Sequence, residues 1–70
     1  MILLIGEPRK WLTATRIQKG HTLKSLADAT GVSPSFICKL EKGLKNPSGS
    51  VAKKLSRELE IKMELFWPEV

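Results

Sequence analysis

A tight glycine-containing connection between two short helical patterns is the feature that most constrains the fold of this 70-residue chain. The first pattern follows Thr22, whose hydroxyl can cap a helix start, and its apolar residues recur at helical spacing: Leu23, Leu26 and Ala27. The second pattern begins at Ser33-Pro34, a cap followed by a proline suited to the first helical turn, and ends at Gly43. Only residues 31–33 connect the two, so the link between the helices is tight.

The rest of the chain also divides into short helices. We expect a first helix over residues 8–19, a fourth that begins after a cap at Ser48, and a last turn near residues 62–66. Only Met1 to Ile5 could form a strand, and the same residues could instead pack as an apolar arm. The sequence therefore predicts one all-α domain over residues 1–70, with an N-terminal arm at 1–6 and a C-terminal segment at 60–70.

The third predicted helix has two chemically distinct faces. On a helical wheel its large apolar residues form one arc: Phe36, Ile37 and Leu40. The opposite arc is small, polar or basic and contains no acid: Pro34, Ser35, Cys38, Lys39 and Lys42. A helix that enters the major groove of DNA needs such a face, because small side chains allow close approach and donors reach base edges. The pair of helices is therefore predicted to be a DNA-binding helix-turn-helix.

The charge distribution also favours a polyanion as partner. The net charge is +5, and it divides into +8 over residues 1–57 and −3 over residues 58–70. One cysteine and one histidine cannot form an internal disulfide or a complete zinc site, and no motif points to an enzyme. No apolar run approaches the ~20 residues of a membrane span. We expect a cytoplasmic protein without metal, cofactor, membrane contact or small-molecule ligand.

Residues 27–48 read ADATGVSPSFICKLEKGLKNPS, and this string resembles the signature of the XRE family, which includes the lambdoid repressor and Cro domains. The resemblance extends over roughly residues 9–67 and implies a five-helix, lambda-repressor-like fold with the third helix in the major groove. It implies three groups of DNA-binding residues. One group faces base edges or the adjacent backbone: Ser33, Pro34, Ser35, Cys38 and Lys39. Another binds a phosphate at a helix N-terminus: Thr22 and Leu23. The last holds the far side of the half-site: Lys42, Lys45 and Asn46.

The resemblance also implies a structural pair, Arg16 with Glu41, and it has one departure. Many lambdoid members carry glutamine at the first position of the second and third helices, where this chain has Leu23 and Pro34. The bidentate contact of glutamine with adenine is therefore absent, and Lys39 remains as the best direct reader of a base, with guanine as its expected partner.

We expect a homodimer on a palindromic operator, because one recognition helix reads only a few base pairs. The preferred dimer contact is Leu65, Phe66 and Trp67, with the arm at residues 1–6 as the alternative. The expected role is a repressor of the phage-like, stand-alone type. A controller or antitoxin-type DNA-binding protein remains open, as does a protein-interaction module that kept the fold.

Overall fold

Four α-helices and one short 3-10 helix make up residues 8–67, the part of the chain that the computed structural model describes. The helices are α1 (Lys10–Gln18), α2 (Leu23–Thr30), α3 (Pro34–Lys42), α4 (Gly49–Leu59) and the 3-10 helix η1 (Met63–Phe66). No strand occurs within residues 8–67, and the all-α class is confirmed. The expected fifth helix is a single 3-10 turn, so the count is four α-helices rather than five. The predicted arm at 1–6 lies outside the described residues.

Local capping sets the ends of α2, α3 and α4. The Thr22 hydroxyl accepts from the Ser25 backbone N–H at 2.9 Å, while the Ser25 hydroxyl accepts from the Thr22 backbone N–H at 2.9 Å, a reciprocal capping box. Ser33 and Ser48 cap α3 and α4 by a single bond each, their hydroxyls accepting from the backbone N–H groups of Phe36 and Val51. Gly31, with φ of +77°, ends α2 in the left-handed conformation that side chains disfavour. These caps place the turn where the sequence predicts it.

Helix α1 is shorter than the sequence predicts, and a long-range contact explains the difference. It begins at Lys10 rather than Pro8 and ends at Gln18. The backbone N–H of Arg9 donates to the carbonyl of Glu41 at 2.8 Å, which draws the chain before α1 towards the end of α3. Pro8 therefore lies before the helix and not in its first turn.

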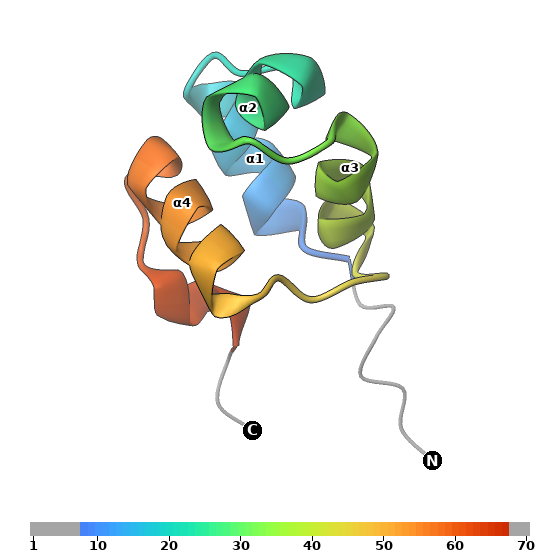
Figure 1. Cartoon of the computed structure of the whole chain (residues 1–70), viewed down its shortest axis with the longest axis vertical. Helices are drawn as coiled ribbons and strands as arrows, with labels where there is room; N and C mark the ends of the chain where they lie inside the picture. The colour runs from blue at the N-terminus through green and yellow to red at the C-terminus, as the bar shows by residue number, and fades with distance from the viewer. Residues whose placement is uncertain (1–7, 68–70) are drawn as a thin grey trace.

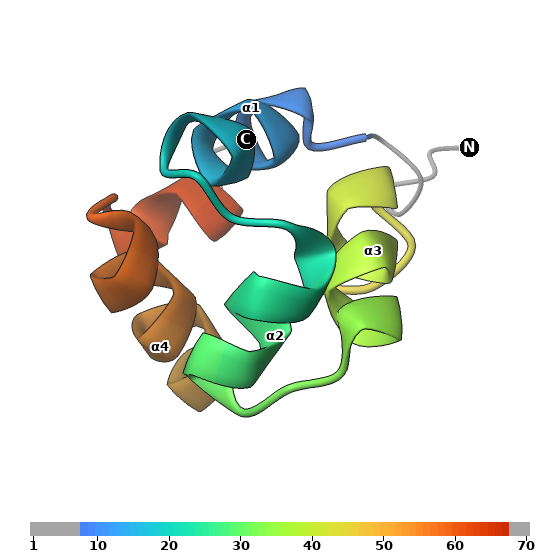
Figure 2. The ribbon, with the colours of Figure 1, turned by 90° about the horizontal axis from the view of Figure 1, so that it is seen from above.

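A core of small and branched apolar residues joins the helices. Its buried members are Leu12, Leu26, Ala27, Ile37, Leu40, Ala52, Leu55, Leu59 and Phe66. Helix α2 contacts both α3 and α4, α1 contacts α3, and η1 contacts α4 (Figures 1 and 2). The Phe66 ring meets Trp11 in an edge-to-face pair with centroids 5.2 Å apart, so η1 closes the core beside α1.

This packing leaves one face of α3 free. Ile37 and Leu40 are fully buried against the core, and Phe36 is half-buried beside them. Helices α3 and α4 lie on opposite sides of the molecule in both ribbon views (Figures 1 and 2). Nothing on α4 therefore covers the outer face of α3. None of the helices within residues 8–67 is long and apolar enough to cross a bilayer.

Candidate nucleic-acid interface

The outer face of α3 is polar and basic along its length. Its exposed residues are Pro34, Ser35, Lys39 and Lys42, and Cys38 is half-buried among them. Ser33 precedes them as the exposed N-cap. The small residues occupy the first turn and the lysines the later ones. A duplex could therefore approach the first turn closely while lysine ammonium groups reach bases and phosphates.

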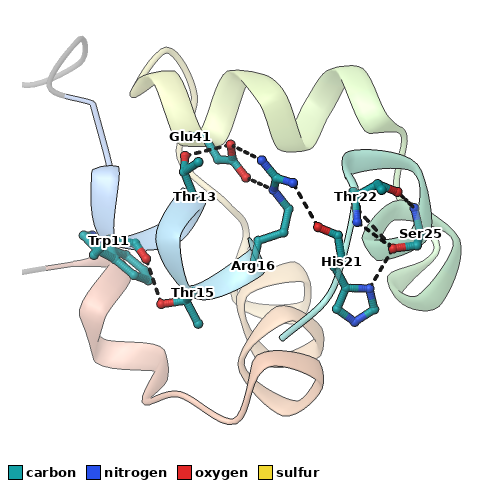
Figure 3. A network of polar contacts seen from close by, with 8 residues as sticks. All are labelled: Trp11, Thr13, Thr15, Arg16, His21, Thr22, Ser25 and Glu41. Atoms are coloured by element: carbon teal, nitrogen blue, oxygen red, sulfur yellow. Dashed lines mark hydrogen bonds and ion pairs between the residues drawn. The ribbon is translucent and has the colours of Figure 1, made fainter. Parts of the chain in front are cut away.

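The single acid of α3, Glu41, points away from this face. Its Oε2 atom accepts from Arg16 Nε at 2.6 Å, and its Oε1 atom accepts from the Thr13 hydroxyl at 2.8 Å (Figure 3). The Arg16 and Glu41 side chains are only 11% and 9% exposed. Arg16 also donates from Nη1 to the His21 carbonyl at 3.0 Å, which ties α1 to the loop before α2. The cluster of Thr13, Arg16 and Glu41 thus removes a carboxylate from the outer face of α3 and fixes α1 to α3.

The N-terminus of α2 forms a second part of the interface. The first intrahelical bond is made by the Leu26 N–H to the Thr22 carbonyl, so the amides of Leu23 and Lys24 precede it. Exposed Thr22 begins the helix, and the Leu23 side chain packs against the core. Leu23 can therefore contribute its backbone amide to a contact, while its side chain is half-buried against the core. Backbone N–H groups and the helix dipole at such a start favour an anion.

The loop between α3 and α4 carries Lys45 and Asn46, both exposed. Arg9 holds this loop from the other side. Its Nη1 atom donates to the carbonyls of Leu40 at 2.7 Å and Lys45 at 3.0 Å, and its Nη2 atom donates to Asn46 Oδ1 at 2.7 Å. Burial lowers the pKa of the Arg9 guanidinium below its ordinary value, yet an arginine keeps its charge throughout the accessible pH range.

Acidic groups gather at the other end of the molecule. Lys19 Nζ donates to Glu60 Oε1 at 2.7 Å, and His21 Nε2 lies 3.0 Å from Glu58 Oε2. The hydrogen bond and charge of Lys19 hold the pKa of the exposed Glu60 carboxyl below its ordinary value. These acids belong to the end of α4, on the side of the molecule opposite α3 (Figures 1 and 2). These two acids therefore lie away from the outer face of α3, on which Lys39 and Lys42 are exposed.

The structure brings the residues expected from the sequence into two neighbouring elements and one loop. The start of α2, the outer face of α3 and the loop after it contain all ten expected DNA-binding positions. Sequence reasoning missed Arg9 and Thr13. Neither stands in the quoted signature, and only a charged side chain ahead of the first helix could have pointed to Arg9.

The C-terminal segment divides into buried and exposed residues. Phe66 is 2% exposed because its ring packs on Trp11, so it belongs to the core of the monomer and not to an exposed contact surface. This corrects its expected place in a dimer contact. Leu65 and Trp67 are 47% and 43% exposed, and with Met63 they leave three large apolar side chains exposed in and beside η1. Within residues 8–67, no cluster of three or more potential metal ligands occurs.

Comparison with known proteins identifies the class. The helix-turn-helix family profile matches residues 12–66, which is most of the chain. The chain belongs to the XRE-type helix-turn-helix family, whose members are DNA-binding transcriptional regulators.

Two relatives come from Bacillus subtilis strain 168. An uncharacterized HTH-type transcriptional regulator, YqaF, is 32% identical over 62 residues, which cover 89% of this chain and 82% of YqaF. The HTH-type transcriptional regulator SlrR is 43% identical over 53 residues, which cover 73% of this chain but only 35% of SlrR. The similarity to SlrR is therefore limited to about a third of that protein.

The buried pair makes a prediction about stability without DNA. Replacing Glu41 by alanine leaves the Arg16 guanidinium buried without its carboxylate and the Thr13 hydroxyl without its acceptor. Breaking a buried ion pair in this way costs about 3–5 kcal/mol. Glu41→Ala should therefore lower the free energy of unfolding by that amount in urea denaturation.

A matched control is Asp28→Ala. Asp28 pairs with Lys24 on the surface of α2 at 3.4 Å, with side chains 70% and 80% exposed. An exposed pair of this kind contributes about 0–1 kcal/mol. If the two variants unfold at the same urea concentration, the Arg16–Glu41 pair has no special structural role.

Proposed function

We propose that the protein is a cytoplasmic transcriptional repressor that binds double-stranded DNA in a sequence-specific manner and reads the major groove with α3. The observation that carries the proposal is the outer face of α3. Two exposed lysines follow a first turn of small residues, and the one acid of the helix is held inward by Arg16. A helix with donors, close access and no repelling carboxylate suits a groove lined by acceptors and flanked by phosphates.

The proposal assigns different tasks to the parts of the interface. Ser33, Pro34, Ser35 and Cys38 form the close-contact surface, and Lys39 reads a base pair from the middle of α3. The N-terminus of α2 at Thr22 and Leu23 binds one phosphate through backbone amides. Lys42, Lys45 and Asn46 bind phosphates on the other side. Phosphate contacts set the position of the domain, and base contacts select the sequence.

We further propose that the active form is a two-fold dimer on a palindromic operator, with Leu65 and Trp67 of the C-terminal segment in the contact. Exposed apolar side chains that lie close together favour association, and aromatic residues are enriched at the centres of interfaces. Pairing of two recognition helices about 34–36 Å apart would double the number of base pairs read.

Duplex binding should be strongly dependent on salt. Lysines that neutralise phosphates release counterions from the duplex. The logarithm of the association constant should therefore fall with the logarithm of the salt concentration, with a slope of roughly −3 to −8 for a bound dimer. Fluorescence anisotropy with random and genomic duplexes at several salt concentrations measures this slope. Weak binding with a flat salt dependence on every duplex would contradict a DNA-binding function and favour an interaction module.

Two lysines should differ in what they contribute. Lys39→Ala should relax sequence selection at one base pair and cost about 1–3 kcal/mol on the preferred operator. Lys45→Ala should weaken binding to all duplexes equally and reduce the salt slope by about one. Binding constants for each variant on a set of single-base operator changes separate the two effects. An even loss across that set for Lys39→Ala would show that this lysine does not read a base.

The dimer can be tested by sedimentation at several protein concentrations, with and without a palindromic operator. Trp67→Ala should weaken self-association. Ile17→Ala is the control and should not, although the Ile17 side chain on α1 is also apolar and is 61% exposed. A wild-type protein that stays monomeric and binds DNA one-to-one would contradict the dimer. Normal association of Trp67→Ala would move the contact to residues 1–6.

A further inference from the structure

Arg9 contacts the end of α3, the loop that follows α3, and η1, all of which are distant from Arg9 in sequence. Its backbone N–H donates to the Glu41 carbonyl at 2.8 Å, and its guanidinium donates to the Leu40 carbonyl at 2.7 Å, both in the last turns of α3. The same guanidinium holds the loop through Lys45 O and Asn46 Oδ1. Its Cζ atom also lies 5.9 Å from the centre of the Phe66 ring in η1. A planar group with several donors is suited to hold these partners together.

The contact with Asn46 fixes the polarity of that side chain. A guanidinium carries only donors, so it must meet the amide oxygen and not the amide nitrogen. The 2.7 Å bond from Arg9 Nη2 therefore commits Asn46 Oδ1 to the protein side. The two N–H groups of Asn46 Nδ2 remain for another partner. These N–H groups are hydrogen-bond donors, and a phosphate oxygen accepts hydrogen bonds.

The contact with Lys45 orders the loop backbone. The Lys45 carbonyl is bound by Arg9 at 3.0 Å, while its side chain remains exposed. Arg9 also places a positive charge at the C-terminal end of α3, where the helix dipole is negative. The Leu40 carbonyl also accepts from the Gly43 N–H at 3.1 Å, so Arg9 adds a second donor there and supplies a donor to the Glu41 carbonyl through its backbone N–H.

We propose that Arg9 is a positioning residue for DNA binding: it orders the loop of Lys45 and Asn46 and turns the Asn46 amide so that its N–H groups point to a phosphate. This role rests on the proposed function of the α3 face. Arg9 acts through Asn46 and the loop, and its own charge is not the main contribution.

The role has a signature in the free protein. In Arg9→Ala, the backbone amides of residues 44–46 should exchange with solvent faster than in the wild type, and the Asn46 side-chain N–H signals should shift. Both are measured by nitrogen–proton NMR without DNA. Lys10→Ala is the matched control, since Lys10 is an exposed cation next to Arg9 and lies in the first turn of α1. It should leave the loop signals unchanged.

A second test of the role of Arg9 measures duplex binding at fixed salt concentration, at a temperature where circular dichroism shows that every variant is folded. Arg9→Ala should bind roughly tenfold more weakly, as expected for loss of hydrogen bonds from a charged group. Arg9→Lys keeps the charge but not the planar set of donors, so it should not restore binding. The double variant Arg9→Ala/Asn46→Ala should bind DNA no more weakly than whichever single variant binds more weakly, because the two residues act as one unit.

The outcomes separate the two claims. Unchanged loop signals in Arg9→Ala, full rescue by Arg9→Lys, or additive losses in the double variant would each overturn the positioning role while the DNA-binding function stands. A wild-type protein that binds no duplex would overturn the proposed function and, with it, the phosphate role of Asn46. Non-additive losses together with faster exchange of residues 44–46 would support the proposal.

Discussion

The structure depends on where the carboxylate of Glu41 points. Glu41 lies in α3, the helix whose outer face would meet DNA, and a carboxylate on that face would repel phosphate. Arg16 and Thr13 instead hold both of its oxygens, at 2.6 and 2.8 Å, on the inner side of the helix. Because Arg16 also binds the His21 carbonyl, the same contacts set the position of α1, α3 and the start of α2 relative to one another (Figure 3). One buried acid thus serves both the fold and the charge of the surface.

The two ends of α3 are controlled by different means. Its start is local: the Ser33 hydroxyl accepts from the Phe36 N–H at 3.0 Å, three residues away in sequence. Its end is set both locally and at long range: Gly43 takes the left-handed conformation and donates its N–H to the Leu40 carbonyl, and Arg9, which precedes α1, binds the carbonyls of Leu40 and Glu41. The cap at the start and Gly43 at the end act within one turn, whereas the contacts of Arg9 with the end of α3 need the folded domain. The loop with Lys45 and Asn46 is therefore held in part by a residue that precedes α1.

The same distinction explains what could be predicted from the sequence. The bounds of α2 and α3 follow from Thr22, Ser33 and the glycines at 31 and 43, because caps and left-handed residues act within one turn. The resemblance to a known family supplied the pairing of Arg16 with Glu41. The late start of α1, at Lys10 rather than Pro8, and the role of Arg9 were missed, since each depends on a contact about 30 residues away.

Phe66 shows a further limit. An aromatic residue near the end of a small domain is consistent with either a core position or an exposed contact, and composition does not distinguish them. The edge-to-face contact with Trp11 decides for the core, while Leu65 and Trp67 on either side remain exposed. Within η1 and the residue after it, Phe66 is buried while Met63, Leu65 and Trp67 stay exposed, so the contact with Trp11 and the core, and not the apolar sequence itself, selects the buried residue.

The central claim is that the outer face of α3, with the start of α2 and the following loop, is the surface that meets DNA. A titration of the nitrogen-labelled protein with a duplex selected from random DNA, followed by NMR, tests it most directly. We expect the largest shifts at the backbone amides of residues 22–24, 33–39 and 44–46, with Pro34 having no amide N–H, and small changes at the end of α4. Shifts concentrated in η1 and the end of α4, with α3 unchanged, would contradict it.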